Sequence, residues 1–270
     1  MSTLTMHAID AHRWRIGFDS PPVNLVTPEL VADLQAALDK VEADPDVKVV
    51  VFESANDHFW LNHFDLARVA DFPVTTDGGP MWTDIVLRLT ELPVVSVAKI
   101  RGRARGGGNE FLLACDLRYA SEERALLGQI EVGTGILPGG GGTERLPRMI
   151  GRDRALEAVL TCNDYPAAVA ARYGWVTEAL PDAELDEHVD SLTARIATFD
   201  KPVLAGAKAQ INRATLPPAE DVRAAYGEFV ESMGQPWFRH RLDLLRRAHS
   251  RHGADLELSL GKHIGRLAED

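Results

Sequence analysis

The sequence predicts a mixed α/β fold, in which a parallel sheet with crossover helices is followed by a helical C-terminal part. Two short apolar runs, at residues 47–52 and 92–100, are typical of parallel strands buried on both faces. Between them, residues 81–92 carry apolar side chains at helical spacing. A strand, helix, strand order of this kind is characteristic of an α/β fold with crossover helices. After residue 183 the apolar spacing is helical.

The N-terminal segments fit this prediction in order. Residues 12–22 alternate apolar and polar side chains and end at a double proline, which indicates an edge strand. A helix is expected next, because Thr27 can cap its first turn and Pro28 suits its first position. Pro93 lies at the start of the strand at 92–100, where a missing N–H donor is tolerated.

The change in pattern divides the chain into an α/β core, residues 1–195, and a C-terminal helical region, residues 196–270. No internal sequence repeat is visible, and the segment after Gly253 has no clear pattern. Short helices are predicted at residues 143–150, 154–161 and 166–173, a strand at 176–180, and longer helices at 185–199, 202–214, 217–233 and 237–250.

Composition narrows the classes of partner. The formal net charge of −11 over 270 residues argues against nucleic acid as the main partner, because phosphate binding needs a basic surface. The basic segment 239–251 is more simply the solvated face of a helix than an anion site. No apolar run is long enough for a membrane span and the N-terminus lacks a signal-peptide pattern. Two cysteines cannot form a disulfide framework, so we expect a cytoplasmic protein.

The residues richest in chemical information begin with a glycine run, Gly106 to Gly108, which leads directly into a predicted helix at Glu110. The first amides of a helix have no acceptor within it, and the helix dipole there favours negative charge. Glycines let a substrate oxygen approach these amides, which makes the run a candidate oxyanion site. Tight packing of the helix against a strand is the alternative explanation.

Glu131 is the second acid of this region and precedes a glycine cluster at 139–142. A carboxylate without a partner is costly to bury, so each glutamate either faces solvent or lies in a cleft with a raised pKa. An isolated glutamate is usually a surface residue, but two beside glycine-rich backbone favour acid–base catalysis. The chain has no phosphate-binding loop, no nucleophile elbow, and no metal-ligand spacing among its nine histidines.

These motifs resemble the enoyl-CoA hydratase/isomerase (crotonase) superfamily. Two segments are most similar: Val97 to Ala120, which contains Gly-Gly-Gly-Asn-Glu, and Gly128 to Leu146, which begins Gly-Gln-Ile-Glu. Weaker matches flank them, so that the resemblance covers most of residues 12–214. It implies a crotonase-like spiral of ββα units with a helical C-terminal region, assembled as a homotrimer or hexamer. It also implies an acyl-CoA thioester as substrate, with no cofactor beyond the coenzyme A that the substrate carries.

The resemblance also implies roles for individual residues. In this family two backbone amides hold the thioester oxygen, and these carry over to Gly107 and Phe64. Two glutamates handle water and the α-proton of a 2-enoyl-CoA, and these carry over to Glu110 and Glu131. Hydration or dehydration is therefore the expected reaction. Isomerisation, thioester hydrolysis, decarboxylation, C–C cleavage and CoA binding without catalysis are the alternatives.

The loop at residues 62–65 departs from the family pattern, which is a small residue followed by Gly-Ala-Asp. His63 replaces a glycine, which puts the backbone conformation of the loop in question; it is either functional or a hydrogen-bonded structural histidine. Phe64 keeps an amide donor, and its side chain could narrow the acyl pocket. Beyond the acids and amides, the substrate-binding residues are expected to be Trp60, Asn62, His63, Asp65, Gly106, Pro138 and Gly139.

Overall fold

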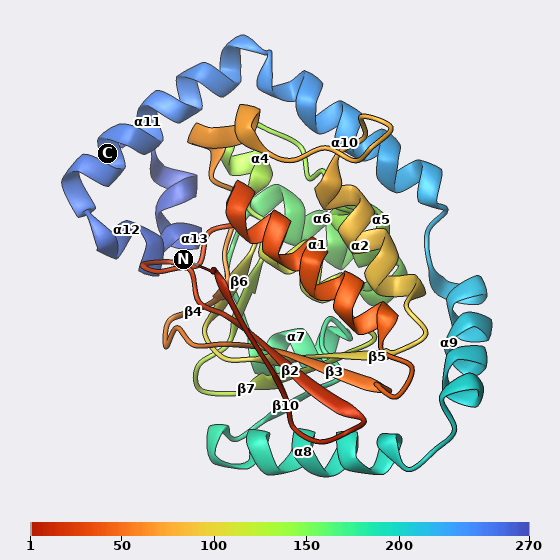
Figure 1. Cartoon of the computed structure of the whole chain (residues 1–270). Helices are drawn as coiled ribbons and strands as arrows, with labels where there is room; N and C mark the ends of the chain where they lie inside the picture. The colour runs from red at the N-terminus through yellow and green to blue at the C-terminus, as the bar shows by residue number, and fades with distance from the viewer. Residues whose placement is uncertain (1, 270) are drawn as a thin grey trace.

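A six-stranded sheet organises the chain in the computed structural model, which describes residues 2–269 (Figure 1). Its strand order is β1-β2-β3-β5-β7-β10; β1 is antiparallel to β2, and all other neighbours are parallel. The predicted parallel sheet is therefore confirmed. The strands are β1 (Leu4–Ala8), β2 (Arg13–Phe18), β3 (Val49–Ser54), β5 (Val95–Ile100), β7 (Leu117–Ser121) and β10 (Glu178–Leu180).

A second, four-stranded sheet explains the spiral. β3, β5 and β7 of the larger sheet are each followed by a strand of the smaller sheet and then by a helix, which produces repeated ββα units. The expected crotonase-like fold is confirmed, although the units share no visible sequence repeat. The strands of the smaller sheet are β4 (Phe59–Leu61), β6 (Arg103–Arg105), β8 (Leu126–Gly128) and β9 (Tyr165–Pro166).

The prediction that residues 12–22 form an edge strand is wrong. β2 lies between β1 and β3, and its Ile16 pairs with Met6 on one side and with Phe52 on the other. The prediction failed because the alternation of apolar and polar residues in β2 does not reveal whether another strand pairs with it. Here Leu4–Ala8 forms that strand. The edge position therefore belongs to β1, whose side chains are mostly exposed or half-buried.

The helices of the α/β body follow the predicted spacing closely. Thr27 caps the first of them by accepting a hydrogen bond from the Leu30 N–H at 3.2 Å, and the apolar face packs into the core. The predicted division near residue 195 falls inside the last of them. These helices are α1 (Pro28–Ala43), the 3-10 helix η1 (Leu66–Asp71), α2 (Met81–Glu91), α3 (Gly107–Ala114), α4 (Glu131–Thr134), α5 (Gly142–Ile150), α6 (Arg152–Thr161), α7 (Ala167–Tyr173) and α8 (Asp182–Ala197).

The C-terminal helices wrap around the body and return to it (Figure 1). The last ones pack against α4, where Leu256, Leu260 and Ile264 form a buried cluster with Ile130 and Cys162. Within residues 2–269, no helix is both long and apolar enough to cross a lipid bilayer. These helices are α9 (Lys201–Thr215), α10 (Ala219–Met233), α11 (Pro236–His252), α12 (Ala254–Leu258), α13 (Leu260–His263) and the 3-10 helix η2 (Ile264–Arg266).

Gly108 offers a test of how closely α3 packs against β4. A Cβ at this position would overlap the carbonyl oxygen of Leu61, so we expect Gly108→Ala to lower the free energy of unfolding by about 2–3 kcal/mol. Gly227 of α10 has open space around it, and Gly227→Ala should raise that free energy by about 0.5–1 kcal/mol because glycine is a poor helix former. Urea unfolding of both variants measures the contrast, and equal effects would show that the packing is not tight.

Candidate active site

The glycine run packs α3 tightly against β4 and leaves one backbone N–H without a partner among the described residues. Gly106 has a φ of 53°, a conformation that favours glycine, and it makes the sharp turn from β6 into α3. Gly108 permits the close packing of α3 on β4, and its N–H donates to the Asn62 carbonyl at 3.0 Å. Gly107 lies between them as the first residue of α3. In the part of the chain that the structure describes, its N–H has no hydrogen-bond partner.

The loop at residues 62–65 contains a second backbone N–H without an acceptor in the described chain, that of Phe64. The Val26 N–H donates to the His63 carbonyl at 3.0 Å, and the Asp65 N–H donates to the Val26 carbonyl at 2.9 Å. This parallel bridge leaves the Phe64 N–H on the opposite side of the loop, without an acceptor among residues 2–269. The Phe64 ring lies over Gly107, where an added Cβ would be 2.7 Å from it.

His63 does not force an unusual backbone on this loop. Among the described non-glycine residues, only Asn24 and Cys162 have a positive φ. The conformation of the loop is therefore open to any side chain at position 63. The histidine in place of the family's glycine adds a side chain to the cavity lining and does not require a positive φ.

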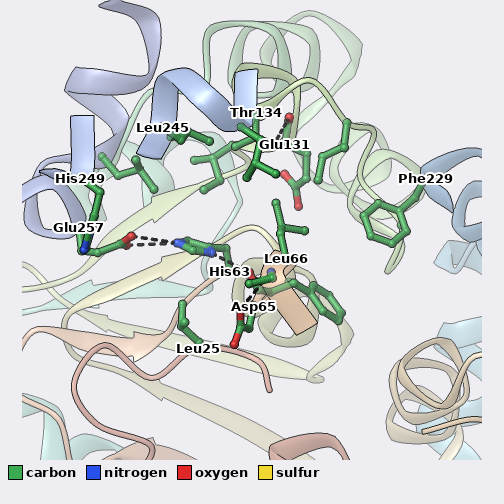
Figure 2. A pocket seen from close by; sticks show the side chains of 18 of the residues that line it. Leu25, His63, Asp65, Leu66, Glu131, Thr134, Phe229, Leu245, His249 and Glu257 are labelled. Carbon is green, nitrogen blue, oxygen red and sulfur yellow. Dashed lines mark hydrogen bonds and ion pairs between the residues drawn. The ribbon is translucent and has the colours of Figure 1, made fainter. Parts of the chain in front are cut away.

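One cavity of about 600 Å³ is lined by the two glutamates and by Phe64 and Gly107, the two residues whose amides have no partner within residues 2–269. The side chains that line it come from the 62–65 loop and from helices far apart in sequence, as Figure 2 shows. Seven of the residues expected from the sequence line this cavity: His63, Phe64, Asp65, Gly107, Glu110, Glu131 and Gly139.

The other expected residues have different surroundings. Trp60 is fully buried in the aromatic core against Phe18 and Phe111, and it does not line the cavity. Its position leaves it outside the site that we propose. Asn62 is fully buried and does not line the cavity. Gly106 lies against both His63 and Glu131, because a Cβ there would be 3.2 Å from His63 Cβ and 3.1 Å from Glu131 Oε1. Pro138 is buried one residue before Gly139.

Glu110 is almost fully buried at 1% exposure and accepts two backbone hydrogen bonds. The Gly140 N–H donates to its Oε1 at 2.7 Å, and the Gly142 N–H donates to the same atom at 3.1 Å. Burial raises the pKa of Glu110 well above its ordinary value, and the negative charge of Glu131 raises it further, because both effects oppose ionisation.

Glu131 is 8% exposed, and only one of its two carboxyl oxygens accepts a hydrogen bond from another described side chain. Its Oε1 accepts from the Gln129 side-chain amide at 2.9 Å, whereas its Oε2 has no partner in residues 2–269. Burial raises the pKa of Glu131, and the hydrogen bond from Gln129 and the charge of His63 only partly oppose this. Two carboxyls that repel each other lose their protons in separate steps, so one can carry a proton while the other is ionised.

His63 forms a half-buried ion pair with Glu257 of α12 (Figure 2). Its Nδ1 faces the Phe64 carbonyl at 2.9 Å, and its Nε2 faces the Glu257 carboxylate at 3.2 Å. Burial alone would lower the pKa of His63, but these two acceptors raise it above its ordinary value. Burial likewise disfavours the Glu257 carboxylate, but His63 and the Asn62 amide hold its pKa at about 2. The pair ties the C-terminal helices to the loop that carries the Phe64 amide.

Several lining residues escaped the sequence analysis. Trp82 and Phe229 form an aromatic wall with Phe64, whose ring centroid is 5.1 Å from that of Trp82 and 6.3 Å from that of Phe229. The segment 239–251 is not merely a solvated helix face, because Leu245 and other residues of α11 also line the cavity. No local signal marks Phe229 or Leu245 as site residues, since only the return of α10 and α11 over the body brings them to the cavity, and Trp82 reaches it from α2.

Comparisons with known proteins identify the family of the chain. The family model described as enoyl-CoA hydratase/isomerase matches residues 12–236. The chain belongs to the enoyl-CoA hydratase/isomerase family. A probable mitochondrial enoyl-CoA hydratase of Dictyostelium discoideum is 30% identical over 194 residues, which are 70% of this chain and 68% of that protein. The family is part of the crotonase superfamily, whose enzymes act on acyl-CoA thioesters.

Solved structures of relatives have the same fold over nearly the whole chain. A crystal structure named "putative enoyl-CoA hydratase" from Streptomyces avermitilis has a TM-score of 0.91 and 41% identity, and the match covers 97% of this chain and 96% of that one. An enoyl-CoA hydratase from Mycobacterium avium subsp. paratuberculosis K-10 has a TM-score of 0.80 and 25% identity, with coverages of 89% and 98%. The likeness to the first of these includes the C-terminal helices.

The ion pair between His63 and Glu257 predicts a pH-dependent contribution to stability. A histidine whose pKa rises on folding stabilises the protein below its unfolded pKa of about 6.5, and this contribution is lost as the pH rises through the folded pKa. A glutamate whose pKa falls stabilises it above its unfolded value of about 4.3. Both contributions therefore overlap at about pH 6.

We expect Glu257→Gln, which keeps the size of the side chain but removes its charge, to lower the free energy of unfolding more at about pH 6 than at about pH 9. Urea unfolding at the two pH values measures this difference. Glu29→Gln is the matched control, because Glu29 pairs with Arg68, which does not lose its proton in this range. An equal loss for Glu257→Gln at both pH values would contradict an ionised His63.

Proposed function

We propose that the protein hydrates a 2-enoyl-CoA thioester, or dehydrates the corresponding 3-hydroxyacyl-CoA. The observation that carries this proposal is that the buried residues Glu110 and Glu131 line one cavity, which Phe64 and Gly107 also line. Both carboxyls have raised pKa values. Groups of this kind are suited to exchanging protons with a substrate near neutral pH.

The two free amides supply the electrostatic part of the mechanism. A thioester oxygen that accepts from the Phe64 and Gly107 N–H groups gains stabilisation as negative charge develops on it. This polarises the conjugated double bond, so that C3 becomes electrophilic. Burial strengthens the effect, because water does not compete for the two donors.

The carboxyls supply the proton transfers. The ionised member of the pair takes a proton from water as the oxygen attacks C3, and the protonated member gives a proton to C2. The net result is addition of H and OH across the double bond, with no change in oxidation state. The aromatic wall of Phe64, Trp82 and Phe229 would surround the acyl group.

Substitution of the two acids tests the mechanism. We expect Glu110→Gln and Glu131→Gln each to lower kcat for hydration of crotonyl-CoA and longer enoyl-CoAs by at least about 100-fold, the usual contribution of general acid–base catalysis. Loss of the double-bond absorbance measures turnover. Glu53→Gln in β3, outside the cavity, is the control for the chemical change.

The outcomes of this experiment separate the alternatives. Full activity in either variant would overturn the two-glutamate mechanism. A product with a displaced double bond and no added water would indicate isomerisation, and a free acid would indicate thioester hydrolysis. Binding of acetyl-CoA by calorimetry, without turnover of any enoyl-CoA, would identify a CoA-binding protein instead.

The proposal extends to assembly and location. We propose a cytoplasmic homotrimer or hexamer that needs no cofactor beyond the coenzyme A of its substrate. Support for assembly comes from α9, which buries none of its residues and exposes 66% of Val203 and 63% of Ile211. Surfaces of this kind mark protein interfaces.

The proposed location rests on the cysteines. Both are buried free thiols, which suits a reducing compartment.

The assembly has its own test. We expect wild-type protein to have the mass of a trimer or hexamer in light scattering, and Val203→Asp combined with Ile211→Asp to shift it toward the monomer, because two charges cannot be buried at an apolar contact. Circular dichroism checks that α9 remains folded. A monomeric wild type would overturn the proposed assembly without affecting the proposed chemistry.

A further inference from the structure

A chain of buried side chains reaches Glu131 from the side opposite the cavity. The Trp175 indole Nε1–H donates to Asn109 Oδ1 at 2.9 Å, and Asn109 Nδ2 donates to Gln129 Oε1 at 2.6 Å. Gln129 Nε2 then donates to Glu131 Oε1 at 2.9 Å. Trp175, Asn109 and Gln129 are each 0% exposed. We call these three residues the amide relay.

The chemistry of the indole sets the direction of every bond in the amide relay. An indole N–H can only donate, so the oxygen of the Asn109 amide must face it. The NH₂ of Asn109 then faces Gln129, which in turn directs the NH₂ of Gln129 to Glu131. A carboxylate can only accept, and a protonated carboxyl needs an acceptor for its own O–H. The amide relay therefore presents a donor to Glu131 Oε1, which favours the ionised form of this carboxyl over the neutral form.

We propose that Trp175 and Asn109 are positioning residues for Glu131, which they orient through Gln129 without touching the substrate. The inference rests on the proposed function, because it assumes that Glu131 exchanges protons with the substrate. The amide relay holds Glu131 Oε1 through the Gln129 side chain and keeps the carboxyl from rotating. Glu131 Oε2 is buried and has no hydrogen-bond partner in the described chain, so the amide relay fixes only one of the two oxygens.

The same residues also connect the two acids. Asn109 directly precedes Glu110 on α3. The Gln129 amide packs against Gly142, where an added Cβ would be 2.8 Å from it, and the Gly142 N–H is one of the two donors to Glu110. A displacement of Gln129 would therefore disturb the hydrogen bonds of both carboxyls.

Other charged and titratable groups also surround Glu131 and must stay constant in a test. They are Glu110 on α3, His63 in the loop after β4, Cys162 after α6 and Arg241 of α11. The first three interact electrostatically with Glu131. Arg241 packs on Gly135, next to α4. Substitution of Trp175 alters none of them directly. The amide relay can thus be examined separately from the charges of the cavity.

The decisive comparison is between two buried tryptophans. Trp175→Phe removes the donor that orients the amide relay and keeps an aromatic ring. Trp60→Phe removes an indole N–H that has no partner in residues 2–269, from a side chain that is equally buried and lies outside the cavity. The matched pair distinguishes loss of the hydrogen bond from loss of buried indole volume.

We expect Trp175→Phe to lower kcat for crotonyl-CoA about three- to tenfold, the effect of one buried hydrogen bond, while KM changes less than about twofold. The pKa of Glu131 should rise by about half to one unit, because Gln129 is then free to turn its oxygen toward the carboxyl. Infrared titration measures this pKa, with the Glu131 band assigned by its disappearance in Glu131→Gln. Trp60→Phe should leave kcat and the titration unchanged.

Asn109→Asp provides a second, independent variant. Both oxygens of the carboxylate that it introduces are acceptors, so Gln129 must turn its NH₂ toward that carboxylate and its oxygen toward Glu131. This reversal, together with the added negative charge, should raise the pKa of Glu131 more than Trp175→Phe does. The titration requires a folded protein but no activity.

The results separate failure of the inference from failure of the proposed function. If Trp175→Phe matches Trp60→Phe in both kcat and titration, or if Asn109→Asp lowers the pKa of Glu131, the positioning role is wrong. If Glu131→Gln keeps full activity, the proposed mechanism is wrong, whatever the titration shows. A higher Glu131 pKa in both Trp175→Phe and Asn109→Asp, with the loss of kcat at constant KM, supports the inference.

Discussion

Burying Glu110 and Glu131 in one cavity costs free energy, because each carboxylate leaves water and the two negative charges repel each other. The surrounding backbone is arranged to limit this cost. Two N–H groups of the glycine cluster donate to Glu110. The backbone can come this close only because Gly140 has no side chain, since a Cβ there would be 2.5 Å from Glu110 Oε2. The glycine density next to these acids follows from that requirement.

The C-terminal helices make the buried environment. α10, α11 and α12 contribute Phe229, Leu245 and Glu257 to the cavity wall, so the site is closed by segments more than 90 residues from Glu131 in sequence. The ion pair between His63 and Glu257 fastens this wall to the loop whose amide is free. Exclusion of water strengthens every electrostatic interaction in the cavity, and the acids and amides would act there at low local dielectric.

Much of the fold could be predicted from periodicity, but the shortest elements could not. β3, β5 and the long helices carry enough residues for an apolar pattern to appear. β4, β6 and β8 have only three residues each, which is too short for a periodic signal, and β1 is too exposed to show one. β4, β6 and β8 belong to the smaller sheet, and β1 forms an edge of the larger one. Because the sequence does not predict β1, β2 is wrongly expected to be an edge strand.

A glycine run before Glu110, a second acid at Glu131 and the family to which both belong can be recognised from the residues alone, and they define the chemistry that is available here. These features are local, and adjacent residues and fixed spacings suffice to show them. The pairing of Glu257 with His63, and the hydrogen bond from Trp175 to the side chains that reach Glu131, depend instead on how the folded chain packs. The ion pair and the hydrogen bond from Trp175 to Asn109 join residues 66 or more positions apart. The packing of whole elements brings such residues together, and no local pattern in the sequence records it.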